Sequence, residues 1–150
     1  MSQGIQSLTV LVDTREQTPW DFGPGVTSLR ATLPSGDYSL PGLMDKVALE
    51  RKSLADLVGS LTAGRDRFMR EMERLSRFDF AAIVVEGDLM NVLRKEYRSD
   101  ASPSSIMGSC AMIHARYGVP TIWCSTRAGA ILYAEKLLRQ NWNAAQAASD

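Results

Sequence analysis

Four ionisable side chains stand where predicted strands end or run through a sheet. Asp13 closes an apolar segment, and Asp37 follows Gly36. Glu50 and Lys52 lie two residues apart, so on an extended strand they point to the same face. Clustered carboxylates repel one another unless they share a cation, and Mg²⁺ or Mn²⁺ prefers oxygen ligands. An acidic pair followed by Glu-x-Lys predicts metal-assisted phosphodiester hydrolysis, with Lys52 polarising a water or stabilising charge on a phosphate.

Apolar runs and turn residues predict the elements that must position these side chains. Strands are expected over residues 8–12, 26–33, 37–40, 46–50, 80–86 and 120–124. Helices are expected from Ser53 to a break at Gly64 and over residues 65–77, 102–117 and 126–140, with a frayed tail at 141–150. Antiparallel strands first and a β-α-β-α order afterwards predict an α/β domain, with a mixed central sheet flanked by helices on both faces.

Three of these strands are informative about the site. The PGLMD segment between residues 40 and 46 suits a hairpin turn, which can bring Asp37 and Glu50 together on paired strands. The run from Phe80 to Glu86 is continuously apolar up to its last residue, which suits a central strand buried on both faces. We expect a structural role for Glu86 at the end of that strand.

Length and composition exclude several classes of protein. The chain has 150 residues, of which 45% are hydrophobic and 23% charged, so it suits one globular domain and excludes a disordered tail, a collagen-like rod or a coiled coil. No long apolar run and no secretory pattern is visible, so we expect neither a membrane span nor secretion. Cys110 and Cys124 are too few for a disulfide scaffold and lack zinc-finger spacing, so we expect reduced thiols.

The net charge of zero is a cancellation of two unlike segments. Residues 1–50 hold three basic and six acidic side chains, a net of −3, whereas residues 51–77 hold seven basic and four acidic ones, a net of +3. Neutrality argues against coating nucleic acid through bulk positive charge. A neutral chain can still bind nucleic acid locally, because arginine outnumbers lysine 13 to 4 and binds phosphate in a bidentate manner.

Longer stretches carry a more specific signal. VLVDTRE, LPSGDYSL, ALERKSLADLVGSL and the GR pair at 64–65 together resemble the nuclease domain of the XPF/MUS81 structure-specific endonucleases. The signature of that family, GD-xn-ERK-xxx-D, stands here as Gly36-Asp37, Glu50-Arg51-Lys52 and Asp56. The resemblance runs on through IVVEGD and TIWCSTRAGAILYAEKLL and covers residues 8–140. It implies a restriction-endonuclease-like fold of the PD-(D/E)xK type in a single ERCC4-type nuclease domain over residues 1–150.

The resemblance also implies residue roles. The residues implied in catalysis are Asp13, Glu16, Asp37, Glu50, Arg51, Lys52 and Asp56. Among them, Asp37, Glu50 and the auxiliary Asp13 are expected to hold Mg²⁺ or Mn²⁺, and Lys52 is the expected catalytic lysine. Glu16 is expected as a second auxiliary acid, and Asp56 as the group that orients Lys52 or Arg51. The residues implied in phosphate or DNA binding are Arg15, Arg51 and Arg65.

Each of these assignments has a plain structural alternative. Asp37 can be a turn residue, and Asp56 can cap its helix and interact with the helix dipole. Glu50 and Lys52 can be exposed strand charges. The arginines at 67–77 favour a solvated helix face with i,i+4 pairs, so phosphate contact is expected chiefly from Arg65.

The expected function is metal-dependent cleavage of branched, flap or fork DNA in repair or recombination. The alternative is an inactive nuclease-fold module that binds DNA or a partner protein, although the intact Asp37, Glu50 and Lys52 argue against it. A third class, a small-molecule-binding α/β protein, lacks a Gly-rich phosphate loop to support it.

Partners and compartment follow from the same resemblance. The expected partners are DNA, branched or partly single-stranded, and a second copy of the chain that packs through residues 102–117 and 126–140. A separate DNA-loading protein is left open, because no helix-hairpin-helix module, which eukaryotic relatives usually carry, is expected within these 150 residues. The expected compartment is the cytoplasm or nucleoid for a prokaryotic or phage protein and the nucleus for a eukaryotic one.

Overall fold

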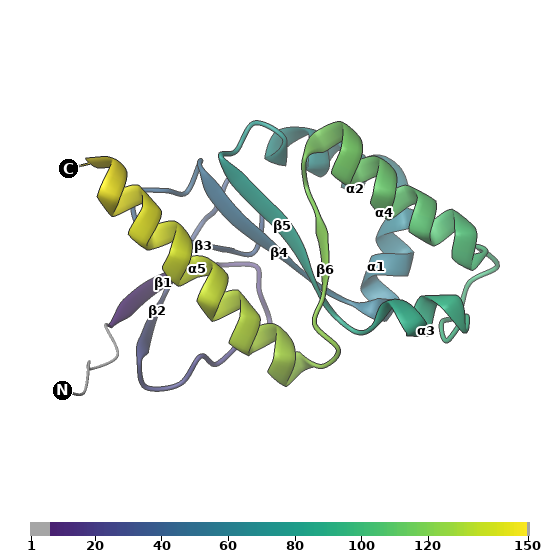
Figure 1. Cartoon of the computed structure of the whole chain (residues 1–150), viewed down its shortest axis with the longest axis horizontal. Coiled ribbons are helices and arrows are strands. Elements are labelled where there is room, and N and C mark those ends of the chain that lie inside the picture. Colours follow the sequence, from purple (N-terminus) through teal and green to yellow (C-terminus); the bar gives the residue numbers. More distant parts are fainter. Residues whose placement is uncertain (1–6, 150) are drawn as a thin grey trace.

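A six-stranded sheet forms the centre of the fold (Figure 1). The structure is a computed structural model and describes residues 7–149. The strands are β1 (Leu8–Asp13), β2 (Val26–Ala31), β3 (Tyr38–Ser39), β4 (Val47–Ser53), β5 (Phe80–Glu86) and β6 (Thr121–Trp123). The helices are α1 (Leu54–Leu61), α2 (Arg65–Leu75), α3 (Leu89–Leu93), α4 (Pro103–Tyr117) and α5 (Arg127–Ser149).

The strand order is β2-β1-β3-β4-β5-β6, with both parallel and antiparallel pairs. β3 pairs antiparallel with β1 and β4, whereas β4, β5 and β6 run parallel to one another. The predicted mixed sheet is therefore confirmed. The expectation that the chain opens with antiparallel strands is wrong for β1 and β2, which are parallel. The segment between them, residues 14–25, has about the dozen residues that a parallel crossover needs, whereas a hairpin needs only two.

Helices cover both faces of the sheet, as predicted. α1, α2 and α4 pack on one face, and α5 lies across the other (Figure 1). The first hydrophobic core lies between the sheet and α1, α2 and α4, and the second lies between the sheet and α5. Ala81, Ile83 and Val85 of β5 belong to the first core, and Ala82 and Val84 belong to the second, which explains why this strand is continuously apolar. A strand buried on both faces has no place for alternating polar residues.

Two helical segments differ from the prediction. α3 was not expected, and its start is fixed by Asp88 and Asn91, whose side chains cap one another's backbone N–H groups. The expectation of a frayed tail at 141–150 is wrong for the described residues 141–149, because α5 continues to Ser149. Trp142 packs against the second core and the segment is rich in alanine, the strongest helix former.

Both cysteines are free thiols, as expected, with Cys110 buried and Cys124 half-buried. Among the helices described, none combines the length and the apolar character that a bilayer crossing requires.

Candidate active site

The β3–β4 hairpin holds Asp37 in place through both its backbone and its side chain. The Asp37 N–H donates to the carbonyl of Leu49 (2.8 Å), and its carbonyl accepts from the Asp13 N–H (2.9 Å). Its carboxylate Oδ2 accepts from the backbone N–H of Arg51 (2.8 Å). Asp37 therefore lies between β1 and β4, next to the strand that carries Glu50.

Gly36 is required by the conformation of this turn. Its φ of +82° lies in the left-handed region, and a Cβ added there would stand 2.8 Å from the Cβ of Ala48. The Gly-Asp pair of the motif is thus explained by sterics: the glycine lets the turn press against β4, which brings Asp37 to its position.

Glu50 is the most unusual group in the site. It is 5% exposed, and in the described part of the chain its Oε2 has no hydrogen-bond partner. Burial raises the pKa of Glu50 well above its ordinary value, and the carboxyl groups of Glu71 and Asp37 raise it further. A buried carboxyl with an unpaired oxygen beside other acids is stable as an anion only when a cation joins it.

Lys52 follows Glu50 by two residues on β4, as the motif required, and its ammonium lies 5.0 Å from the ring centroid of Phe68. It lines an open cavity of about 370 Å³ together with Asp56, Arg67 and Glu71. Cation–π contact with a buried ring holds the ammonium at the wall of this cavity. Asp56 is exposed and lines the same cavity, and its backbone N–H donates to the capping Ser53 hydroxyl (3.1 Å); its role in orienting Lys52 or Arg51 stays a prediction.

Asp13 is 2% exposed and fully engaged. Its carboxylate accepts from Arg15 Nε (2.7 Å), from Arg15 Nη2 (3.1 Å) and from the Leu33 N–H (3.0 Å). Burial raises the pKa of Asp13, but the hydrogen bonds from Arg15 and Leu33 outweigh it and leave the pKa below its ordinary value. The structure thus pairs Asp13 with Arg15; its assignment as a metal ligand stays a prediction.

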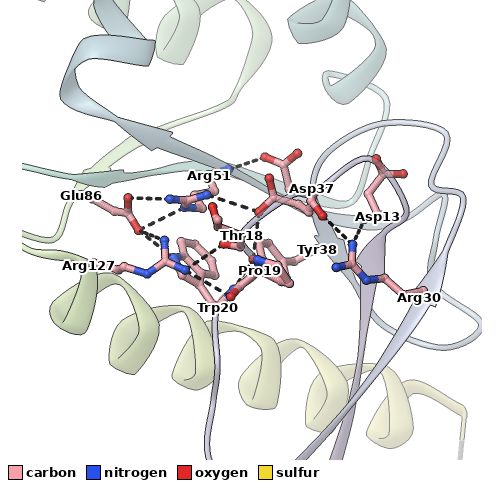
Figure 2. Close-up of polar contacts among 11 residues, drawn as sticks. Asp13, Thr18, Pro19, Trp20, Arg30, Asp37, Tyr38, Arg51, Glu86 and Arg127 are labelled. Atoms are coloured by element: carbon pink, nitrogen blue, oxygen red, sulfur yellow. Dashed lines mark hydrogen bonds and ion pairs between the residues drawn. The ribbon is translucent and has the colours of Figure 1, made fainter.

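A cluster centred on Glu86 adjoins Asp37, because Arg51 contacts both carboxylates (Figure 2). Arg51 binds the Glu86 carboxylate through Nε and Nη2, both at 3.1 Å. Trp20 Nε1 donates to the same carboxylate (2.8 Å), and Arg127 Nη1 approaches it at 3.3 Å. Burial raises the pKa of Glu86, but these donors reverse the effect and hold the pKa below its ordinary value.

This Glu86 cluster reaches Glu16 through aromatic side chains. Trp20 stacks on Tyr38 with 4.5 Å between ring centroids, and the Tyr38 hydroxyl donates to Glu16 Oε2 (3.1 Å). Arg51 Nη1 lies 3.6 Å from the same oxygen. Burial raises the pKa of Tyr38, so the phenol stays protonated and can keep donating to Glu16.

The structure therefore separates the predicted residues into groups. Asp37 and Glu50 lie close together, Lys52 lines the neighbouring cavity with Glu71, and Glu16 and Arg51 join the Glu86 cluster. Arg65 lies apart: its Nη1 donates to Ser109 Oγ (2.8 Å) and the Leu61 carbonyl (3.2 Å), which ties α2 to α4. Its predicted phosphate contact stays a prediction.

Two acidic residues near the site were not singled out for function. Glu86 was expected to be structural, and its partner Arg127 follows it by 41 residues, so no local pattern reveals the pair. Glu71 was hidden in a charged helix. Its Oε1 accepts from the Gly36 N–H (3.3 Å). Its position three residues after the buried Phe68 is the one sequence signal that places it on the inner side of α2.

The donor set fits a hard divalent cation. Among residues 7–149, no group of three or more Asp, Glu, His or Cys side chains is gathered into a ready metal-binding cluster. Asp37 and Glu50 nonetheless supply carboxylate oxygens close to one another, and Glu50 Oε2 lacks any other partner. Oxygen ligands of this kind suit Mg²⁺ or Mn²⁺, which keep several waters and need few protein ligands.

Comparison with known proteins agrees with this geometry. The ERCC4 domain family matches the chain over residues 12–137. The chain belongs to the ERCC4 domain family. Its fold resembles that of XPF from Aeropyrum pernix, with a TM-score of 0.70 and 28% identity over 89% of this chain. A second structure, XPF from Aeropyrum pernix in complex with DNA, matches with a TM-score of 0.69 and 29% identity over 91% of this chain.

The match extends to the fold class and is partial in length. The restriction-endonuclease-like fold expected from the motifs is confirmed by these structures and by the mixed sheet with its flanking helices. This chain spans 64% and 66% of the two XPF chains, which is less than two thirds of their length. No curated protein sequence matches the chain.

Proposed function

We propose that this ERCC4 domain protein is a metal-dependent DNA endonuclease that hydrolyses phosphodiester bonds in branched, flap or fork DNA, in repair or recombination. The observation that carries the proposal is the buried Glu50 with an unpartnered oxygen, beside Asp37 and two residues before Lys52. The match to XPF, one structure of which is a complex with DNA, supports DNA as the substrate.

The residues present divide the chemistry between them. Asp37 and Glu50 would hold Mg²⁺ or Mn²⁺, which when bound supplies Lewis acidity and an activated water. Lys52, at the wall of the open cavity, would donate a hydrogen bond to the attacking water or to a non-bridging phosphate oxygen. Water attack on phosphorus breaks one P–O ester bond and leaves a phosphate monoester and a hydroxyl.

The arginines have different capacities for DNA. Arg51 is held between Glu86 and Glu16, with 19% of its side chain exposed, so its first role is to orient carboxylates. Arg15 holds Asp13 while 69% of its side chain is exposed. We infer that Arg15 reaches a phosphate at the mouth of the site without releasing Asp13, because a guanidinium has five donors.

The test is cleavage of labelled flap, fork and plain duplex DNA with Mg²⁺, Mn²⁺ or EDTA. We expect branch-proximal cuts that require the metal and are lost in Asp37→Asn and in Glu50→Gln. Glu73→Gln on the exposed side of α2 is the matched control and should cut like the wild type. Metal-dependent cleavage that survives both site substitutions would overturn the metal assignment, and no cleavage by folded protein would favour the inactive DNA-binding module.

We also propose that two copies pair through α5 and the neighbouring edge strand β6. Leu132 and Tyr133 on α5 are 67% and 45% exposed, which is high for large apolar side chains. Tyr133 borders an open pocket lined also by Trp123 and Cys124 of the β6 region. β6 is the last strand of the sheet, so a second copy can cover both features at once.

A further inference from the structure

Glu71 lies beside the candidate metal site although it belongs to none of the recognised motifs. It projects from the middle of α2 and is half-buried, on the side of the helix that carries the buried Phe68 and Met72. Its carboxylate Oε1 accepts a hydrogen bond of 3.3 Å from the backbone N–H of Gly36. Gly36 immediately precedes Asp37, so Glu71 contacts the turn that positions a proposed metal ligand.

A second contact shows that α2 docks on this turn. Arg74, three residues after Glu71, donates from Nε to the hydroxyl of Ser35 (3.1 Å). Ser35 is buried, whereas Arg74 is exposed, so this contact lies at the edge of the surface between α2 and the turn. The turn that ends in Asp37 is therefore held by hydrogen bonds to β1 and β4 of the sheet and to α2, which packs on one face of the sheet.

Glu71 also faces Glu50. The unpartnered Oε2 of Glu50, a residue only 5% exposed, lies in a neighbourhood that holds the carboxyl groups of Glu71 and Asp37. Glu71 also lines the open cavity that holds Lys52 and Asp56, so its carboxyl group belongs to the surroundings of the candidate site. Without a cation, repulsion from Asp37 and Glu50 opposes the attraction of Glu71 to Arg15, so we expect the charge of Glu71 to add little net stability.

We propose that Glu71 is a positioning residue of the metal centre: it fixes the Gly36–Asp37 turn and adds the negative charge that strengthens cation binding by Asp37 and Glu50. It acts beside the direct ligands and is not one of them, because its Oε1 already accepts a hydrogen bond from the Gly36 N–H. The inference rests on the proposed metal-dependent nuclease function. Residues that support metal ligands from outside commonly change metal affinity by about 10–100-fold.

A helix-docking role alone would make a different prediction. Glu71→Gln keeps an oxygen that can accept from the Gly36 N–H and removes only the charge. If Glu71 serves docking alone, this variant should bind metal like the wild type. If its charge serves the cation, the variant should bind metal more weakly, and it should be no less stable than the wild type when metal is absent.

The experiment is Mn²⁺ titration of the full chain by calorimetry, with melting temperatures measured in EDTA. Glu73→Gln is the matched control, since Glu73 stands on the same helix with 62% of its side chain exposed and pairs with Arg77 at 3.9 Å. We expect Glu71→Gln to raise the Mn²⁺ dissociation constant about 10-fold or more. Glu73→Gln should stay within twofold of the wild type, and Glu71→Gln should melt in EDTA at or above the wild-type temperature.

Each result decides the inference. If the wild type binds Mn²⁺, Asp37→Asn does not, and Glu71→Gln binds like the wild type, the metal site stands and the role of Glu71 is overturned. A lower melting temperature for Glu71→Gln in EDTA with an unchanged dissociation constant would show docking alone and overturn it too. If the wild type itself binds no Mn²⁺, the metal assignment falls, and the role of Glu71 falls with it.

Discussion

Replacing Glu86 by alanine tests whether the cluster around it holds the architecture next to the site. The Glu86 side chain is 8% exposed and that of Arg51 is 19% exposed, and the two are joined by hydrogen bonds of 3.1 Å each. Removing one partner of such a buried pair costs about 3–5 kcal/mol. The substitution also leaves Trp20 Nε1 without its acceptor, which itself costs about 1–3 kcal/mol.

Two features make the total free-energy cost of Glu86→Ala smaller than these two costs added together. Arg51 keeps Glu16 at 3.6 Å, and Arg127 is 41% exposed, so its part of the cluster is screened by water. We therefore expect Glu86→Ala to lower the free energy of unfolding by about 3 kcal/mol. At this chain length that corresponds to a melting temperature lower by about 6–12 °C.

The assay is urea unfolding followed by tryptophan fluorescence, in EDTA at pH 7. Glu86→Gln should lose less than Glu86→Ala, because its amide oxygen still accepts from Trp20. Glu73→Ala, which breaks only an exposed pair with Arg77, should lose no more than about 0.5 kcal/mol. Because the pKa of Glu86 is lowered in the fold, its contribution should fade as the pH drops below about 4.3 through that lowered pKa. A loss below about 0.5 kcal/mol for Glu86→Ala would show that the cluster does not stabilise the fold.

Because the pKa of Glu50 is raised in the fold, Glu50 should contribute fully to the stability of the metal-free protein below about pH 4.3 and lose that contribution as the pH rises through the raised pKa. The measurement is the melting temperature of the wild type and of Glu50→Gln as a function of pH. Parallel curves for the two proteins would contradict this prediction. Lys52→Ala should slow cleavage by about 10²–10⁴-fold in single-turnover kinetics and leave the Mn²⁺ affinity measured by calorimetry nearly unchanged. Equal cleavage rates for the variant and the wild type would show that Lys52 takes no part in the reaction. Replacing Leu132 and Tyr133 by glutamate should convert dimers to monomers in light scattering, and a wild-type monomer would end the dimer proposal.

Local patterns predicted most of the fold. The run from Phe80 to Glu86 had the right length and composition for a strand covered on both faces, and it forms β5 with those bounds. Ser53 was expected to open a helix, and its hydroxyl caps α1 by accepting from the Asp56 N–H. These features depend on residues close together in sequence, so single-sequence reasoning could find them.

Features that depend on distant residues were not predictable. Nothing local distinguishes a parallel from an antiparallel partner for β1, since that choice depends on the path of the loop up to Gly25. The pairing of Glu86 with Arg127 and of Glu71 with Gly36 spans 41 and 35 residues. The motif placed Asp37, Glu50 and Lys52 in one site, whereas their supporting contacts come from elements that only the tertiary structure brings together.

The proposed function depends most on Glu50 being a carboxylate that is kept buried for a cation. The most direct measurement is the melting temperature of Glu50→Gln and of the wild type, each in EDTA and in Mn²⁺. We predict that Glu50→Gln melts higher than the wild type in EDTA, because the buried unpaired acid is gone, and that Mn²⁺ raises the melting temperature of the wild type only. A Glu50→Gln variant that melts lower in EDTA and is still stabilised by Mn²⁺ like the wild type would show that Glu50 does not hold the cation.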